Sequence, residues 1–377
     1  MSEIGVSCTL MRGGTSKGLF FLDSDLPSDS ELRTRTILAA FGSPDPRQID
    51  GLGGADPLTS KVAIIRPSDE PEIDVEYTFG QVSISEPWID FSANCGNMSS
   101  AVGPFAIEKR LVSPQQPVTR VRILNTNTSK VIVSEVPVRD GKVVTGGTYR
   151  IDGVPGSGAE IKLHFLDPGG GATGKLLPTG NPRDQITLED GKTVDVSIVD
   201  AGNPAGFVRA DQIGLGGHEL PEQIESRNEI LNVLEELRAK ISEILGLCSS
   251  WRQAYQHYTS LPKIVFVAQP TTFETLQGEV IQAERIDILA RVMAMGRLHK
   301  AFAVTAGIPT AAASRIPGSV VHQLCRQRPK TLSIGHPSGT LSLEVSVEGG
   351  EEGVSVREVV VGRTARKLME GTVFVNG

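Results

Sequence analysis

A cysteine flanked by amide side chains is the first feature of this sequence that could carry chemistry. Cys95 lies in the segment Ser92–Asn97, after a strand-like pattern and before a helical one. At the start of a helix, unpaired backbone N–H groups and the helix dipole favour a thiolate, and the same groups can hold a substrate carboxylate. The alternative is a plain helix cap, with the side chain of Asn94 or Asn97 as the capping group.

Two further segments carry cations beside glycines. In Met11–Gly18, two cations, two hydroxyls and three glycines form a hairpin-like turn whose amides could wrap a carboxylate, with Arg12 suited to bidentate contact. In Gly51–Lys61, a glycine-rich loop leads into an apolar strand, where a partly desolvated lysine could act as an acid or a base. The alternatives are an ordinary surface hairpin and a lysine that extends to water.

The second half of the chain offers weaker signals. The turn His336–Thr340 has two hydroxyls and a free amide at Gly339 that could contact a carboxylate, and a plain turn is the alternative. Gly169–Lys175 has the spacing of a phosphate-binding loop, but Leu176 replaces the required hydroxyl and Pro178 prevents the helix that should follow. No two histidines have metal-ligand spacing. We therefore expect neither a nucleotide nor a metal.

The composition is that of a globular protein, with 39% hydrophobic and 21% charged residues. The net charge is −7 and the basic residues are scattered, so nucleic acid is not an expected partner. The N-terminus does not resemble a signal peptide, and no stretch approaches the roughly 18 apolar residues of a membrane span. We expect a cytoplasmic protein that does not bind membranes, and a homo-oligomer is compatible with the sequence.

The pattern of elements favours an α+β protein. Helical spacing predicts helices at about Pro221–Leu245, Gln282–Ala301 and Asn97–Arg110, the second of them packed inside its domain because it is apolar on most sides. Many strands with one central helix in each half indicate two similar lobes instead of a doubly wound parallel sheet. The predicted strands are Lys17–Leu22, Lys61–Ile65, Ile73–Phe79, Thr119–Leu124, Lys130–Val136, Thr193–Val199, Lys263–Ala268, Leu341–Val347 and Val354–Val361.

A chain of 377 residues is long enough for two domains. The Gly- and Pro-rich stretch Asp167–Pro182 is the expected boundary, which gives an N-terminal lobe of residues 1–182 and a C-terminal lobe of residues 183–377. The final strand, Gly371–Val375, could cross back to the first lobe.

Taken together, these segments resemble the PrpF-like family of methylitaconate isomerase, 2-methylaconitate isomerase, aconitate isomerase and 4-oxalomesaconate tautomerase. The resemblance covers nearly the whole chain, in order. It is carried by Met11–Gly18, Gly42–Asp45, Ile49–Lys61, Asn94–Asn97, Leu177–Asn181 and Met295–Phe302.

The resemblance implies a diaminopimelate epimerase-like fold, in which each lobe is a mixed β-barrel or curved sheet around a central helix and substrate lies in the cleft between the lobes. It also implies that no metal, flavin, nicotinamide or pyridoxal cofactor is needed. In the family the acid/base pair is a lysine and a cysteine, which fall on Lys61 and Cys95. The residues expected to bind substrate are Arg12, Gly13, Gly14, Thr15, Ser16, Lys17, Asn94, Gly96, Asn97, Met98, Asn203, Lys300, Ser338, Gly339 and Thr340.

The chemistry of these residues agrees with an isomerase. Moving a C=C bond relative to a carboxylate needs a base, a site for dienolate charge and an acid, and the sequence leaves open which of Lys61 and Cys95 is the base. An epimerase of this fold would need two facing thiols, but neither Cys248 nor Cys325 lies in a glycine-rich turn like that of Cys95.

We therefore expect an isomerase of a small unsaturated di- or tricarboxylate. The segment Arg47–Leu58 looks closest to methylitaconate isomerase and 4-oxalomesaconate tautomerase, and we expect a methylitaconate-type substrate in preference to aconitate, 2-methylaconitate or 4-oxalomesaconate. The alternatives are a cofactor-free epimerase or racemase, and a polycarboxylate-binding protein without catalysis.

Overall fold

The computed structural model describes residues 3–257, 260–326, 330–350 and 353–376. The chain forms two compact units, Met1–His164 with Gly362–Gly377, and Phe165–Val361. This division differs from the expected boundary after residue 182, because the Gly- and Pro-rich stretch is not a linker. The amide of Gly202 donates to the carbonyl of Pro168 at 2.7 Å, and that of Asp200 to Leu176 at 3.0 Å. These hydrogen bonds hold the stretch in the second unit.

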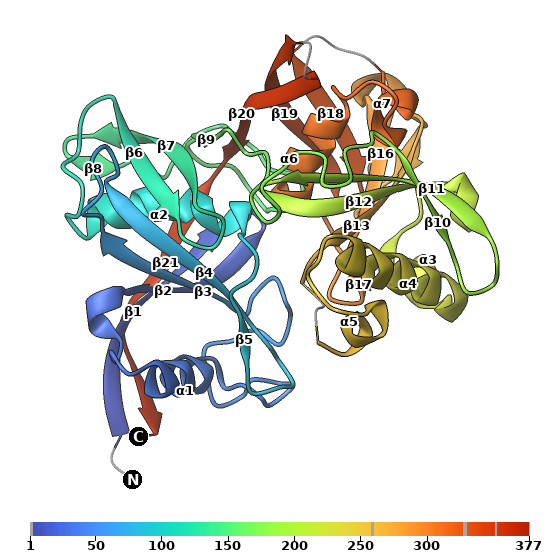
Figure 1. The fold of residues 1–377 in the computed structure, drawn as a ribbon. Helices are drawn as coiled ribbons and strands as arrows, with labels where there is room; N and C mark the ends of the chain where they lie inside the picture. Colours follow the sequence, from blue (N-terminus) through green and yellow to red (C-terminus); the bar gives the residue numbers. More distant parts are fainter. Residues whose placement is uncertain (1–2, 258–259, 327–329, 351–352, 377) are drawn as a thin grey trace. The chain divides into compact units, whose positions relative to one another are not determined.

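The first unit is built on strands paired in the order β21–β1–β2–β3–β4–β6–β7. The last strand of the chain lies antiparallel to the first, from Glu3 opposite Asn376 to Gly13 opposite Ala365 (Figure 1). The chain therefore ends in the unit in which it began. The strands are β1 (Glu3–Gly13), β2 (Ser16–Leu22), β3 (Lys61–Pro67), β4 (Val75–Val82), β5 (Ile89–Asp90), β6 (Val118–Asn125), β7 (Lys130–Arg139), β8 (Lys142–Val143), β9 (Ile161–Leu166) and β21 (Ala365–Asn376).

Two helices, α1 (Ser30–Phe41) and α2 (Gly96–Glu108), pack on opposite faces of these strands. Successive strand residues point to opposite faces, so Phe21 joins the apolar cluster under α1, whereas Phe20 meets Phe105 of α2 with ring centroids 5.6 Å apart. Every residue of α2 except its last is buried, which makes it the central helix of the unit. The helix expected from about Asn97 is confirmed.

The second unit pairs its strands in the order β10–β11–β12–β13–β16–β18–β19–β20. Its helices are α3 (Pro221–Glu225), α4 (Asn228–Ile244), α5 (Trp251–His257), α6 (Val304–Ala313) and α7 (Val320–Leu324). Its strands are β10 (Asp184–Thr187), β11 (Thr193–Ala201), β12 (Asn203–Arg209), β13 (Lys263–Ala268), β14 (Phe273–Glu274), β15 (Val280–Ile281), β16 (Ile288–Ala294), β17 (Arg297–Leu298), β18 (Thr331–His336), β19 (Gly339–Gly350) and β20 (Gly353–Arg363).

The two units repeat one pattern of strand pairing, although the sequence shows no repeat of letters. In the first unit, β1, β2, β3, β4, β6 and β7 are joined by antiparallel, parallel, antiparallel, parallel and antiparallel pairings. In the second, β11, β12, β13, β16, β18 and β19 follow the same series. By chain order, α4 corresponds to α1 and α6 to α2. The expected α+β fold of two similar lobes is confirmed.

One predicted helix is wrong. The apolar run assigned to a helix at Gln282–Ala301 forms the strands β16 and β17, joined by a turn in which Met295 and Gly296 have φ of 55° and 71°. A strand buried on both faces is apolar at successive positions, so its pattern does not differ from that of a buried helix. The fully buried helix of this unit is α6, which contains Gly307 and Pro309.

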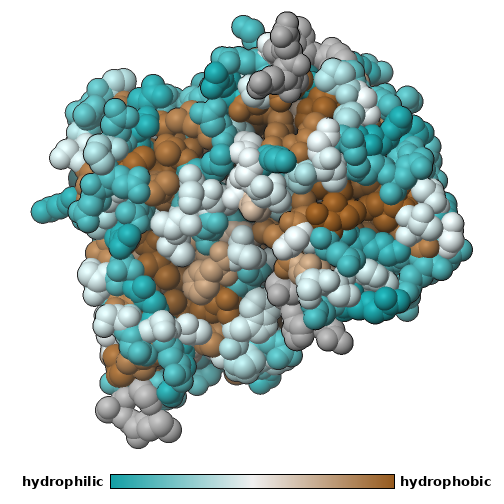
Figure 2. All heavy atoms as spheres, viewed as in Figure 1, coloured by the Kyte–Doolittle hydropathy of each residue, from teal (hydrophilic) through white to brown (hydrophobic). Residues whose placement is uncertain are grey.

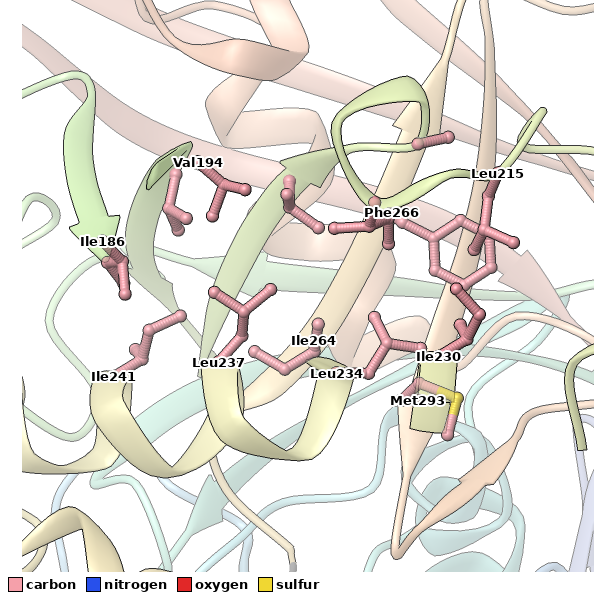
Figure 3. Packing of buried hydrophobic residues seen from close by; sticks show 14 of the residues in the cluster. Ile186, Val194, Leu215, Ile230, Leu234, Leu237, Ile241, Ile264, Phe266 and Met293 are labelled. Carbon is pink, nitrogen blue, oxygen red and sulfur yellow. The ribbon is translucent and has the colours of Figure 1, made fainter. Parts of the chain in front are cut away.

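The predicted amphipathic helix from Pro221 is present as two helices, α3 and α4. Leu234, Leu237 and Ile241 of α4 point toward the sheet residues Ile264 and Phe266 (Figure 3). The surface over α4 is largely hydrophilic in Figure 2, as expected for a helix with one apolar side. In the part of the chain that the structure describes, no helix combines the length and the hydropathy needed to span a membrane.

Candidate active site

The turn between β1 and β2 lies directly against the first residues of α2. A Cβ atom added at Gly13 would lie 2.5 Å from the carbonyl oxygen of Asn97, and one added at Gly14 would clash with the Asn97 side chain. Gly14 also has a φ of 51°, which favours glycine. Asn97 Nδ2 donates to Thr15 Oγ1 at 3.0 Å. Two segments identified separately in the sequence therefore form one structure.

The third segment joins them through strand pairing. Gly18 of β2 is opposite Lys61, the first residue of β3, in a parallel register. A Cβ atom at Gly18 would clash with the Lys61 carbonyl oxygen and would lie 2.7 Å from Cε of Met98. This close approach places Lys61 beside the first turn of α2.

Lys61 is held by side chains of β4. Its side chain is buried, and Nζ donates to Gln81 Oε1 at 3.0 Å and lies 5.2 Å from the centre of the Phe79 ring. Gln81 Nε2 donates to the carbonyls of Pro57 and Ser60 at 3.1 and 2.9 Å, which fixes the amide so that its oxygen faces the amine. Sequence reasoning missed Gln81 and Phe79; the period-two pattern of β4 was their only signal.

Cys95 is the N-cap residue of α2, with an extended backbone and a free thiol. Within the described residues, the side chain of Cys95 makes no capping hydrogen bond to this helix. Asn94 Oδ1 accepts the N–H of Cys95 itself at 2.6 Å, and Asn97 Nδ2 donates to Thr15 Oγ1. Among the described residues, no side chain accepts a hydrogen bond from the amides of Gly96, Asn97 and Met98, which a negative group could therefore use.

The remaining residues of the turn differ in what they contact. Arg12 Nη1 donates to the carbonyls of Gly14 and Thr364, both at 2.9 Å, so Arg12 braces the turn. Burial lowers the pKa of Arg12, and the charge of Arg366 lowers it further. Ser16 is buried, and its hydroxyl has no hydrogen-bond partner among the described residues. Lys17 is half-buried.

The other predicted binding residues belong to the second unit. Ser338 Oγ donates to the carbonyl of Lys300 at 2.6 Å, which joins two of them. Gly339 has a φ of 135°, Thr340 is half-buried, and Asn203 is buried at the start of β12. Their role in binding substrate stays a prediction.

The repeated topology locates the second-unit counterpart of Cys95. The N-cap residue of α6, the helix that corresponds to α2, is Ala303. Cys325 ends α7, and Cys248 follows α4. No thiol of the described residues stands where the fold would place a mirror image of Cys95.

The segment Gly169–Lys175, which has the spacing of a phosphate-binding loop, is bound by a side chain of its own unit. In Gly169–Lys175, the carboxylate of Asp200 accepts the amides of Ala172 and Thr173 at 2.9 and 2.7 Å, so a side chain occupies the amides that a phosphate would need. Among the described residues, no three His, Cys, Asp or Glu side chains form a group suited to a metal ion.

Comparison with known sequences gives one family over the whole chain. The family described as PrpF protein matches residues 3–376. The chain is 46% identical to 3-methylitaconate isomerase of Eubacterium barkeri, covering 99% of this chain and 98% of that protein. It is 38% identical to 2-methyl-aconitate isomerase of Cupriavidus necator, covering 100% and 98%.

Solved structures agree with this assignment. A crystal structure of methylitaconate-delta-isomerase matches with a TM-score of 0.82 and 45% identity, over 100% of this chain and 96% of that one. A hydroxyproline epimerase from Agrobacterium vitis matches with a TM-score of 0.59 and 12% identity, over 99% and 93% of the two chains. The second likeness concerns the fold alone.

Proposed function

Because the chain belongs to the PrpF family, we propose that it is an isomerase that shifts a C=C bond in a small unsaturated di- or tricarboxylate by proton transfer, without a cofactor. The substrate is of the methylitaconate type. This preference is supported by 46% identity to 3-methylitaconate isomerase, against 38% to 2-methyl-aconitate isomerase. The mechanism is supported by the close approach of Gly18 to both Lys61 and Met98 in the first turn of α2, the helix that Cys95 precedes in the same unit.

The reaction needs one group to accept a proton and another to give one. One of Lys61 and Cys95 removes a proton from the carbon next to the double bond, and the electron pair delocalises into the carboxylate as a dienolate. The other group delivers a proton to the far carbon of the allylic system, and the double bond moves. Protons are conserved, and the pair returns to its starting state by exchange with water or with each other.

The negative charge of the dienolate would be stabilised by donors fixed before substrate binds. The first amides of α2 and the hydroxyl of Ser16 are such donors, since none of them has a side-chain acceptor in the described structure. Buried polar groups of this kind normally have partners, and a carboxylate would supply one.

An epimerase is the second candidate, because the fold is shared with a hydroxyproline epimerase. Such an enzyme with two thiol bases would need a second cysteine at the start of α6, where this chain has Ala303. This observation favours isomerisation over racemisation.

Solvent-deuterium incorporation, followed by NMR, tests the proposal. With methylitaconate as substrate, the wild-type protein should isomerise it and introduce deuterium, and Cys95→Ser or Lys61→Met should lower the rate by about 10²- to 10⁴-fold, the usual contribution of an acid or base. Cys248→Ser is the matched control and should keep full activity. A wild-type protein that binds the acid but exchanges nothing would identify a binding protein, and loss of activity in Cys248→Ser would favour the epimerase.

The substrate is identified by ultraviolet absorbance, because conjugation changes when the double bond moves. Itaconate, methylitaconate, cis- and trans-aconitate, 2-methylaconitate and 4-oxalomesaconate form the panel. A kcat/KM for aconitate or oxalomesaconate well above that for methylitaconate would overturn the substrate preference and leave the reaction type in place.

A further inference from the structure

The segment that leads from β20 into β21 lies against the turn between β1 and β2. The amide of Gly14 in this turn donates to the carbonyl of Thr364 at 3.0 Å. A Cβ atom added at Gly14 would lie 3.2 Å from Cδ of Arg363 and would clash with the side chain of Asn97. Arg363 and Asn97 therefore both lie against Gly14, which places Arg363 near the first turn of α2.

The guanidinium of Arg363 is buried and has no acidic partner. The residue is 5% exposed, and its Nη1 donates to the carbonyl of Gly362 at 3.0 Å. Within the described residues, no hydrogen bond occupies Nε and no carboxylate forms an ion pair with the group. Burial lowers the pKa of Arg363 to about 10, and the charges of Tyr149 and Asp152 oppose this shift, so the group is charged at neutral pH. A buried charge without a partner is destabilising, and a bound anion would supply the partner.

Two other arginines show how a structural guanidinium is held in this protein. Arg291 is fully buried, but its Nε and Nη1 donate to three backbone carbonyls and its Cζ lies 5.3 Å from the centre of the Phe273 ring, so only Nη2 lacks a partner. Arg12 donates to two carbonyls. Arg363 has one, and its Nε and Nη2 have no acceptor among the described residues. This edge offers two parallel N–H groups, the geometry that suits a carboxylate.

We propose that Arg363 binds a carboxylate of the substrate, and that its guanidinium and the first turn of α2 together select acids with two carboxylates. A small diacid could place one carboxylate at the helix amides and the other at Arg363, because both lie beside Gly14. The inference rests on the proposed function for the class of ligand. It adds a cation that lies outside the sequence motifs, and it leaves Arg12 the role of bracing the turn.

The test measures the binding of an acid that cannot react. The saturated analogue of methylitaconate is 2,3-dimethylsuccinate, and its monoamide has the same skeleton with a single carboxylate. In isothermal titration calorimetry, Arg363→Met should bind the diacid about tenfold to a hundredfold more weakly than the wild-type protein does, the loss expected for hydrogen bonds to a charged group. The monoamide should lose clearly less affinity, because its one carboxylate can bind at the helix.

Two controls separate recognition of the acid from folding. Arg357→Met removes an exposed arginine of the same strand, β20, which pairs with Glu348 at 2.6 Å, and it should leave both affinities unchanged. Without ligand, Arg363→Met should have a Tm no lower than that of the wild-type protein, because an apolar chain of similar length replaces a buried charge without a partner. If Arg363→Met does not fold, Arg363→Gln carries the same comparison, since its amide can still donate to the Gly362 carbonyl.

The outcomes that would overturn the proposal are distinct. They are an unchanged affinity of Arg363→Met for the diacid, a wild-type protein that does not bind the diacid, and an equal loss for diacid and monoamide, which with a lower Tm would show that Arg363 is structural. Calorimetry needs no turnover, so these results are independent of the proposed reaction. A protein that isomerises no acid of the panel but binds the diacid through Arg363 would retain this inference and contradict the isomerase.

Discussion

Replacing Gly18 with alanine should disturb the candidate site at one defined point. The added Cβ atom would clash with the Lys61 carbonyl oxygen and would lie 2.7 Å from Met98 Cε and 2.9 Å from the Lys61 carbonyl carbon. Cβ atoms essentially never come within 3.0 Å of heavy atoms to which they are not bonded. Strands β2 and β3 must therefore move apart where Gly18 is paired with Lys61. The Met98 side chain can turn away, whereas the backbone of Lys61 cannot move without carrying its amine.

Two effects follow, and their sizes differ. Overpacking of this kind costs about 1–3 kcal/mol, which for a unit of this size lowers Tm by roughly 2–12 °C. Displacement of a catalytic group by about 1 Å can lower the rate about 10²-fold. We therefore expect Gly18→Ala to lose far more activity per folded molecule than its loss of stability alone would explain.

The assay compares Tm by calorimetry with kcat by ultraviolet absorbance at a temperature where the variant is folded. Gly371→Ala is the matched control, because Gly371 lies in β21 of the same unit and a Cβ atom there would meet nothing within 4 Å. If Gly18→Ala and Gly371→Ala showed the same kcat, the reasoning that places Lys61 at the site through its contact with Gly18 would be refuted.

Three further predictions follow from the same contacts. Gln81→Leu removes the acceptor of the Lys61 amine and should lower kcat without abolishing folding, measured beside circular dichroism; unchanged kinetics would contradict the role given to Gln81. The Glu370 carboxyl has a lowered pKa because Lys109 donates to it, so Glu370→Gln should cost less than about 1 kcal/mol at neutral pH. The stability difference between the wild-type protein and Glu370→Gln is fully present above the ordinary carboxyl pKa of 4.5 and should vanish as the pH falls through the lowered pKa of Glu370. Urea unfolding at several pH values can follow it. Leu237→Ala should cost about 2–5 kcal/mol in the second unit, seen as a lower urea midpoint, because Leu237 is fully buried in the core under α4.

Local patterns in the sequence were sufficient to predict a helix or strand that packs against the core with one face only. The nine predicted strands are all present, and so is the helix that starts near Cys95. The helix expected at Gln282–Ala301 failed for the opposite reason. Its residues lie between two neighbouring strands, and full burial removes the periodicity by which a strand differs from a helix.

The sequence by itself determined which residue types could do proton chemistry and which segments carry them: a cysteine before a helix, a lysine before a strand and a turn of glycines and cations. Only the tertiary structure decided that these segments meet, because the parallel pairing of β2 with β3 and the packing of α2 join positions far apart in the chain. It also showed that Gln81 accepts a hydrogen bond from the Lys61 amine and that the last strand, β21, pairs with the first, β1. Partners of this kind depend on which strands pair and in which register, and residues such as Lys61 and Gln81 lie 20 positions apart in the chain.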